Sequence, residues 1–307
     1  MTDHHLDPAP GQEHDHSLEA DIARMLNMTA SRRQSLRWLF AGAATLPVIG
    51  CGGGDSSAAA GTTGTTGTVM AAPPAATPVA STPVTGTSAS GATCAVVPEE
   101  TGGPYPGDGT NNGVNGVANA LILAGVIRSD IRASFAGATA VAAGVPLTIK
   151  LQLQNVGASC APLAGAAIYI WHCDRDGNYS MYSPGVTGEN YLRGVQQVDA
   201  SGAVTFTTIF PGCYSGRMPH VHFEVYPTLA KASSAANRIK TSQFTFPMAT
   251  LNDVYASAGY GTSVRNLAAI SYATDMVFSD GTALQMAAMS GSVASGYVAT
   301  LTIGVSA

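Results

Sequence analysis

The chain has 307 residues, and its low share of charged side chains (11%), its 35 glycines and its 17 prolines are typical of a loop-rich β protein rather than a helical bundle. The net charge of −5, with no basic run beyond residue 37, argues against nucleic acid as the main partner. A small neutral or anionic molecule remains open as the ligand.

Residues 1–51 have the features of an export signal. The stretch 31–37 resembles a twin-arginine motif, with Ser35 in the place of the usual Phe. An apolar segment at 38–49 follows, and it is too short to cross a bilayer as an ordinary helix. We therefore set this region apart from the folded part of the protein.

The signal ends in a segment, residues 48–51, that resembles a lipobox. In that interpretation the thiol of Cys51 is acylated after cleavage, and the protein is a membrane-anchored lipoprotein. Two other interpretations stay open. One is a plain signal peptide with a chance cysteine, which predicts a periplasmic or extracellular protein, and the other is a buried apolar helix.

Residues 52–93 consist almost entirely of Gly, Ala, Ser, Thr and Pro. Such a segment cannot bury enough apolar surface to offset the entropy of ordering, so we expect a flexible linker. A linker of this kind suits a folded domain that stands away from a membrane.

From residue 94 onward the apolar residues alternate with the short period of β-strands, and turns rich in Gly and Pro separate the segments. The predicted strands are residues 146–153, 166–171, 203–210, 220–226, 242–246 and 298–305. Short helices are expected within 117–131 and 229–236. This pattern predicts an all-β protein: a single β-sandwich domain at 94–307 with long loops and a few short helices.

The cysteines of this domain form an even set in a chain predicted to be exported: Cys94, Cys160, Cys173 and Cys213. One or two disulfides are therefore expected rather than a zinc site. The spacing does not fix the pairing. The working hypothesis joins Cys94 to Cys160 and Cys173 to Cys213.

Four of the seven histidines lie ahead of the twin arginines and would be removed with the signal. His172, His220 and His222 remain in the mature chain. His220 and His222 lie two apart on a predicted strand, so both imidazoles point to one face while Val221 points to the other. Two imidazoles in this arrangement can share a metal ion. A pair of buried, hydrogen-bonded histidines gives the same pattern.

Two tyrosines and an arginine accompany these histidines. Tyr214 follows a Pro-Gly bend, Arg217 lies between it and His220, and Tyr179 follows an Asp-Gly turn. A single buried phenol is usually a packing residue. Two phenols beside two imidazoles favour a trivalent cation, because such an ion stabilises phenolate well below its free pKa of about 10. Anionic oxygen ligands favour ferric iron over zinc or copper.

At this point the sequence resembles the intradiol ring-cleavage dioxygenases, the family of the catechol and protocatechuate enzymes. The resemblance runs in order through roughly residues 98–247 and includes both tyrosines and both histidines. The matching segments are PEETGGPY at 98–105, IWHCDRDGNYS at 170–180, NYLRG at 190–194 and FPGCYSGRMPHVHF at 210–223.

The resemblance implies one ferric ion per chain, held by Tyr179, Tyr214, His220 and His222. Arg217 corresponds to the family's active-site arginine, which stabilises charge on the substrate ring, and Gln243 to its active-site glutamine. The spacing from His222 to Gln243 is longer than in better-known members, so an insertion is expected around 229–238. Tyr105 is expected to line the substrate pocket, together with Arg217 and Gln243.

Other aromatic residues receive no role from the resemblance. Tyr182 competes with Tyr179 for the ligand position, but Tyr179 lies closer to the turn and fits the motif better. Tyr169, Tyr182 and Tyr191 are expected to be packing residues, and the family gives His172 no ligand role.

The implied activity is the opening of a catechol ring, with O2 inserted between the two hydroxylated carbons to give a muconate-type dicarboxylate. The catechol would bind the ferric ion through both oxygens and displace Tyr214, which takes up a proton. Catechol and O2 are the expected partners. The particular catechol and the oligomeric state stay open.

Two interpretations from other classes remain. A non-catalytic exported β-sandwich module that binds a glycan or a protein is compatible with the same fold. A zinc hydrolase needs a carboxylate base near the histidines, and Glu224 is the candidate.

Overall fold

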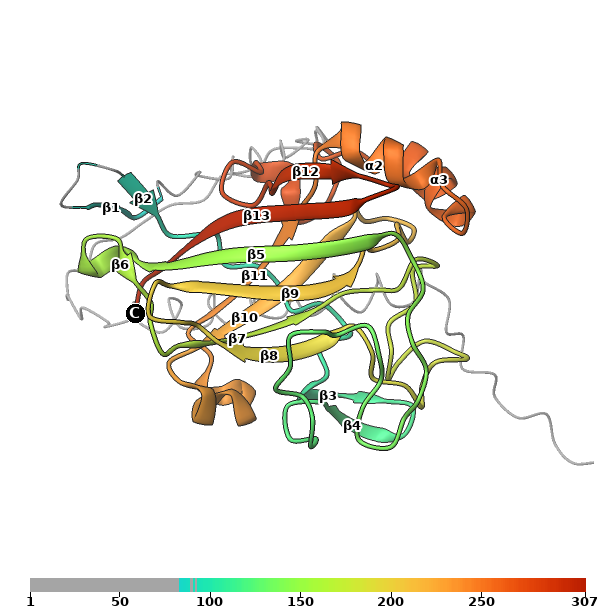
Figure 1. The fold of residues 1–307 in the computed structure, drawn as a ribbon, viewed down its shortest axis with the longest axis horizontal. Coiled ribbons are helices and arrows are strands. Elements are labelled where there is room, and N and C mark those ends of the chain that lie inside the picture. The colour runs from blue at the N-terminus through green and yellow to red at the C-terminus, as the bar shows by residue number, and fades with distance from the viewer. Residues whose placement is uncertain (1–82, 89–90, 92) are drawn as a thin grey trace, which may run out of the picture. The chain divides into compact units, whose positions relative to one another are not determined.

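Alternating apolar residues build a sandwich of two β-sheets in the computed structural model, which describes residues 83–88, 91 and 93–307 (Figure 1). The first sheet has the strand order β11(Lys240–Thr245), β10(His220–Tyr226), β7(Ala167–Trp171) and β8(Arg193–Gln197). The second contains β12(Ala288–Ser292), β13(Gly296–Val305), β5(Pro146–Asn155), β6(Ala161–Pro162) and β9(Ala203–Ile209). The predicted all-β sandwich is confirmed.

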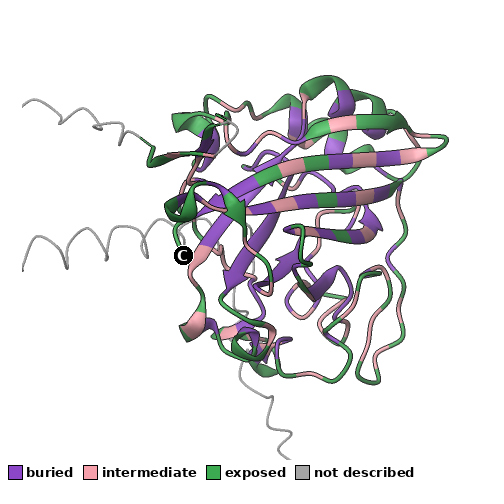
Figure 2. Cartoon of the chain, turned by 60° about the vertical axis from the view of Figure 1, so that its left-hand side comes forward, coloured by how far each residue is buried: buried purple, intermediate pink, exposed green. Residues whose placement is uncertain are grey.

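The core between the sheets comes from the period of two along the strands. Strand β5 alternates between buried and more exposed positions, and its buried side chains Leu147, Ile149 and Leu151 belong to the main hydrophobic cluster (Figure 2). Val221 and Phe223 of β10 belong to the same cluster from the other sheet. Burial of these apolar side chains is the main force that holds the two sheets together.

Short elements complete the described part of the chain. Two hairpins are β1(Thr85–Thr87) with β2(Thr93–Ala95), and β3(Asp108–Gly113) with β4(Gly116–Asn119). The helices are α2(Met248–Tyr255) and α3(Gly261–Ala268), with 3-10 turns η1(Val156–Ala158), η2(Leu229–Ser233), η3(Ala235–Asn237) and η4(Phe278–Asp280). No helix among the described residues is long and apolar enough to cross a membrane.

The six predicted strands correspond to β5, β7, β9, β10, β11 and β13, and β10 has the predicted bounds. The helix expected within 117–131 is wrong, because this segment pairs with strand edges instead. The N–H of Arg128 donates to the carbonyl of Val195, and that of Ile131 donates to Thr207. The segment 229–238, where the resemblance predicts an insertion, forms η2 and η3 between the paired strands β10 and β11.

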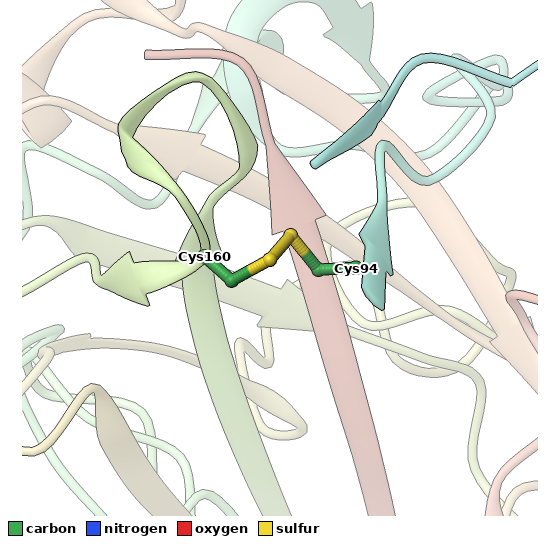
Figure 3. Close-up of a disulfide and its surroundings, with 2 residues drawn as sticks. All are labelled: Cys94 and Cys160. Atoms are coloured by element: carbon green, nitrogen blue, oxygen red, sulfur yellow. A yellow bond between two sulfur atoms is a disulfide. The ribbon is translucent and has the colours of Figure 1, made fainter. Parts of the chain in front are cut away.

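The first expected disulfide is present and the second is absent. Cys94 in β2 is bonded to Cys160, which precedes β6 (Figure 3). Cys173 and Cys213 are buried free thiols, so the predicted bond between them is not found. Each thiol donates to a backbone carbonyl instead, Cys173 to Gly212 and Cys213 to Arg217.

The leader, with its twin-arginine motif at 31–37 and its lipobox at 48–51, lies outside the described residues. So do Cys51 and most of the linker at 52–93. The export signal and the lipid anchor therefore stay predictions.

Candidate active site

Strand β10 is buried on both faces, and the two faces serve different purposes. Val221 and Phe223 point into the sandwich core, whereas His220 and His222 point to the opposite side of the sheet. All seven residues of β10 are buried, so the outward face of this strand is covered as well. The strand therefore presents two imidazoles to an enclosed space outside the sandwich core.

Four side-chain donor atoms meet at this place. Nε2 of His220 lies 3.0 Å from Nε2 of His222, 3.3 Å from Oη of Tyr214 and 3.4 Å from Oη of Tyr179. The structure thus brings together the two phenols and two imidazoles that the sequence singled out. Two nitrogens and two oxygens around one point are a donor set that suits ferric iron.

The protonation of the histidines fits cation binding. Burial lowers the pKa of His220 to about 3, and it lowers the pKa of His222 well below its ordinary value, so both rings are neutral at pH 7. Nδ1 of His220 lies 2.6 Å from the carbonyl oxygen of Met218, which accepts a hydrogen bond from the protonated Nδ1. The lone pair of His220 is then at Nε2, the atom that faces the other three donors.

The phenols need a cation to ionise. Burial raises the pKa of Tyr214 to about 12, and it raises the pKa of Tyr179 well above the ordinary value. Both hydroxyls are therefore protonated unless a strongly charged ion lies beside them. The residues present fit a trivalent metal ion, which would stabilise both phenols as phenolates.

Local turns place the two tyrosines. Oδ1 of Asp174 accepts hydrogen bonds from the N–H groups of Asp176 and Asn178, which closes the turn between β7 and Tyr179. Gly212 begins the bend before Tyr214, and a Cβ there would lie 2.5 Å from the carbonyl oxygen of Arg175. Only glycine allows the two loops to approach so closely.

Neighbouring strands supply the side chains that flank the histidines. Trp171 of β7 pairs with His222 in the register, and their rings stack with centroids 4.8 Å apart. Gln243 of β11 pairs with His222 from the other side, so it shares the same face. The register thus places Gln243 at the site regardless of the insertion that precedes it.

Arg217 and Gln243 are bonded to each other. Nη2 of Arg217 donates to Oε1 of Gln243 at 2.7 Å, and Nε2 of Gln243 donates to the carbonyl of Thr101 at 2.8 Å. Nε of Arg217 donates to Asp275 at 3.0 Å. Both members of this ion pair are buried, with exposed fractions of 1% and 0%, so the pair is shielded from solvent screening.

The segment before β3 covers the histidines from outside. The ring of Tyr105 lies 5.0 Å from that of Tyr179, and Gly103 has a positive φ of 69°. A Cβ at Gly103 would lie 3.2 Å from Cε1 of His222, which is tighter than an ordinary contact. The backbone of this segment therefore packs directly on a ligand-type ring, and Tyr105 lies beside the site as expected.

The other aromatic residues have their polar atoms engaged elsewhere. The Tyr182 hydroxyl donates to Asn111 and accepts from the N–H of Gly107, so this competitor for the ligand position is occupied. The hydroxyl of Tyr169 donates to Pro106, that of Tyr191 donates to Asp174, and His172 bonds to Cys173 and Thr208.

Comparison with known proteins finds matches to part of this chain. A family model described as dioxygenase matches residues 133–230. A chlorocatechol 1,2-dioxygenase from Rhodococcus opacus is 32% identical over 82 residues, which is 23% of this chain and 32% of the relative. The match thus spans about a third of the length of that relative.

Solved structures share the fold. An intradiol ring-cleavage dioxygenase from Tetranychus urticae superposes with a TM-score of 0.53 at 24% identity, over 69% of this chain and 95% of that one. A 3-chlorocatechol 1,2-dioxygenase from Rhodococcus opacus 1CP is more distant, with a TM-score of 0.38 at 17% identity over 64% and 74% of the two chains. The first of these superpositions shows a shared fold.

Residues 133–230 therefore match a dioxygenase family, and the domain has the fold of a solved intradiol ring-cleavage dioxygenase.

Glu224 is not placed as a hydrolytic base. Its carboxylate is buried, accepts a 2.6 Å hydrogen bond from the Tyr226 hydroxyl, and lies 3.9 Å from Arg238. The part of the chain that the structure describes contains no cluster of three or more His, Cys, Asp or Glu side chains that could hold a metal ion.

Two residues that support this candidate site escaped the sequence analysis. Asp275 lies 58 residues after Arg217, and no local pattern connects them. Arg193 is 1% exposed and holds the backbone carbonyls of Tyr105, Pro106 and Ser180. Arg193 lies within the matching segment 190–194, but the sequence does not show that its side chain is buried, and only that burial reveals its role.

Proposed function

We propose that this protein is a ferric intradiol dioxygenase that opens the ring of a catechol with O2. The observation that carries the proposal is the meeting of Tyr179, Tyr214, His220 and His222 at one buried point. A ferric ion bound there would supply Lewis acidity, which lowers the pKa of the catechol hydroxyls and makes the ring electron-rich. The match of residues 133–230 to a dioxygenase family and the similarity to a chlorocatechol 1,2-dioxygenase support this reaction class.

Tyr214 is the residue suited to receive a proton. It is half-buried, whereas Tyr179, His220 and His222 are each no more than 2% exposed. Tyr214 therefore has the most room to move when a catechol enters. Its Oη takes one of the catechol protons, which keeps that proton within the site.

Arg217 and Gln243 suit the stabilisation of negative charge on the substrate. Nη1 of Arg217 is buried and has no hydrogen-bond partner in the structure, while its Nε and Nη2 are both engaged. A free, buried donor held in a fixed orientation stabilises developing charge at little reorganisation cost. The bond between the two hydroxylated carbons then breaks, and both atoms of O2 end in the dicarboxylate.

Iron content, visible absorption and oxygen uptake test this proposal together. Purified protein loaded with ferric iron should be coloured by tyrosinate-to-iron charge transfer, and the band should shift when catechol is added without oxygen. With oxygen, one O2 should be consumed for each ring opened. A colourless protein that holds zinc, or a coloured one that consumes no oxygen with any catechol of a substituted panel, would exclude this function.

A further inference from the structure

Asp275 occupies an unusual place among the buried carboxylates of the described chain. It comes from the segment between α3 and η4, far in sequence from the strands that carry the site. It is fully buried, with an exposed fraction of 0%. A buried carboxylate is costly unless every oxygen is paired, so its partners indicate what it is there to hold.

The partners of Asp275 are four donors from two segments. Its Oδ2 accepts from Nε of Arg217 at 3.0 Å and from the N–H of Met218 at 2.6 Å. Its Oδ1 accepts from the N–H groups of Val277 at 2.8 Å and Phe278 at 3.1 Å. The second pair fixes the carboxylate on its own segment, and the first pair fixes Arg217 against it.

Asp275 and Gln243 together determine where the guanidinium of Arg217 points. An arginine side chain has several rotatable bonds, and one hydrogen bond leaves it several orientations. Here Nε is held by Asp275 and Nη2 by Gln243, so the planar group has a single orientation. The remaining nitrogen, Nη1, is the one without a partner.

The guanidinium of Arg217 lies near the donor cluster. The guanidinium interacts electrostatically with the phenols of Tyr214 and Tyr179, and it lies 6.0 Å from the ring centre of Phe278. The same carboxylate oxygen of Asp275 also binds the N–H of Met218, whose carbonyl contacts Nδ1 of His220. One carboxylate oxygen thus fixes both Arg217 and the backbone that leads into β10.

We propose that Asp275 is a positioning residue for ring cleavage, which orients Arg217 so that Nη1 faces the bound substrate. This inference rests on the proposed function. Asp275 itself does not touch the reacting atoms and acts through Arg217. Its removal should therefore reduce turnover without reducing iron binding.

The test compares Asp275→Asn, Arg217→Met and the double variant, each loaded with iron, with kcat expressed per bound iron. A misplaced charge donor should lower kcat in Asp275→Asn by roughly 10- to 100-fold, with KM changed by less than about twofold. Arg217→Met should lose on the order of 100-fold. Adding Asp275→Asn to Arg217→Met should cost no more than about a further twofold.

The matched control is Asp253→Asn, the same substitution at a carboxylate of α2 that accepts a hydrogen bond from Tyr297. It should leave kcat unchanged. Iron content and the charge-transfer band are measured on every sample, since a merely structural defect would change both. Losses that multiply in the double variant, or a kcat of Asp275→Asn equal to wild type, would overturn the inference.

A structure of the wild type decides the matter if Asp275→Asn does not fold. Iron-loaded protein is crystallised with catechol in the absence of oxygen. Nη1 of Arg217 within hydrogen-bond distance of the substrate, with Nε still on Asp275, supports the inference, and any other placement of Nη1 overturns it. Failure of the wild type to open a catechol in oxygen refutes the proposed function itself and is read from a separate measurement.

Discussion

Among the four ligand-type residues, exposure separates the two tyrosines. Tyr179 is 1% exposed and packs against the ring of Tyr105, whereas Tyr214 is half-buried at the end of a loop. A phenol that must leave its place and accept a proton needs room, and one that only holds a metal does not. The structure therefore supports different roles for two chemically identical side chains.

Tyr214→Phe should abolish ring opening while most of the bound iron is retained, because three donors remain. Tyr179→Phe should lower iron content as well, since a donor is lost from the most enclosed position. Visible spectra and iron analysis on the purified variants measure both effects. Tyr182→Phe is the matched control, because its hydroxyl bonds Asn111 and Gly107 instead of the cluster.

This control also tests which tyrosine is the ligand. Tyr182→Phe should keep the colour and the turnover and lose about 1 kcal/mol of stability from its hydrogen bonds. Loss of the charge-transfer band in Tyr182→Phe, with the band intact in Tyr179→Phe, would mean that the two assignments are reversed.

At the scale of elements, strand β10 contributes both to the core and to the site, because its period of two turns successive side chains toward opposite faces of the sheet. Its odd-numbered residues fill the sandwich core, and its even-numbered residues carry the site. The second face needs a cover of its own. Loops, the β3–β4 hairpin and η2 provide it, so their attachment to the strands decides how well the site is enclosed.

Arg193 of β8 is the main attachment. Its guanidinium donates to the carbonyls of Tyr105 and Pro106 in the covering segment and to Ser180 in the loop after Tyr179. These acceptors are neutral, so the buried charge is stabilised by hydrogen bonds to carbonyl dipoles. Arg193 thereby joins two loops that otherwise have no continuous backbone pairing with β8.

Replacing this residue should loosen the cover. Arg193→Met keeps most of the side-chain volume but leaves buried carbonyls unpaired, which should cost about 3 kcal/mol of unfolding free energy. Denaturant unfolding of the iron-free protein measures the loss. Arg132→Met is the control, because that guanidinium pairs with Asp130 on the surface and should contribute little. Equal effects of the two substitutions would contradict the attachment role.

At the scale of the whole molecule, residues near both ends of the described domain meet beside the site. The N–H of Glu100 donates to the carbonyl of Thr241 in β11. Its side chain accepts a hydrogen bond from Gln285, which is 185 residues away in the sequence. Gln285 also donates to the carbonyl of Gln243. The early and late segments thus close around the same strand.

Glu100 gives this closure a pH dependence. Burial, with Asp280 nearby, raises the pKa of Glu100 from 4.5 to about 7. The folded state therefore binds this proton more tightly than the unfolded chain does, and the resulting stability is full below pH 4.5 and is lost as the pH rises through 7.

Glu100→Gln should remove this dependence, because the amide stays neutral and can still accept from Gln285. In thermal melts from pH 4.5 to pH 8.5, the melting temperature of the variant should rise relative to that of the wild type as the pH rises. Glu189→Gln is the comparison, a carboxylate that accepts from the N–H of Ala140 elsewhere. A difference between Glu100→Gln and wild type that does not change with pH would refute the role of ionisation.

Much of this arrangement follows from local sequence. The period of two put His220 and His222 on one face, and the turns before Tyr179 and Tyr214 were visible as Asp-Gly and Pro-Gly pairs. These features depend only on neighbours within a few residues, so they can be predicted from the sequence alone. The leader and the linker rest on sequence patterns alone and stay predictions.

Tertiary structure alone decided the contacts between residues far apart in the chain. Asp275 meets Arg217, Glu100 meets Gln285, and Cys173 and Cys213 stay reduced beside each other's loops. Part of the segment 117–131 pairs with strand edges instead of forming a helix. The edges of β8 and β9 have backbone N–H and C=O groups that need hydrogen-bond partners, and this segment supplies them. Such contacts depend on which distant segments the folded sheets bring together, and this cannot be read from a single sequence.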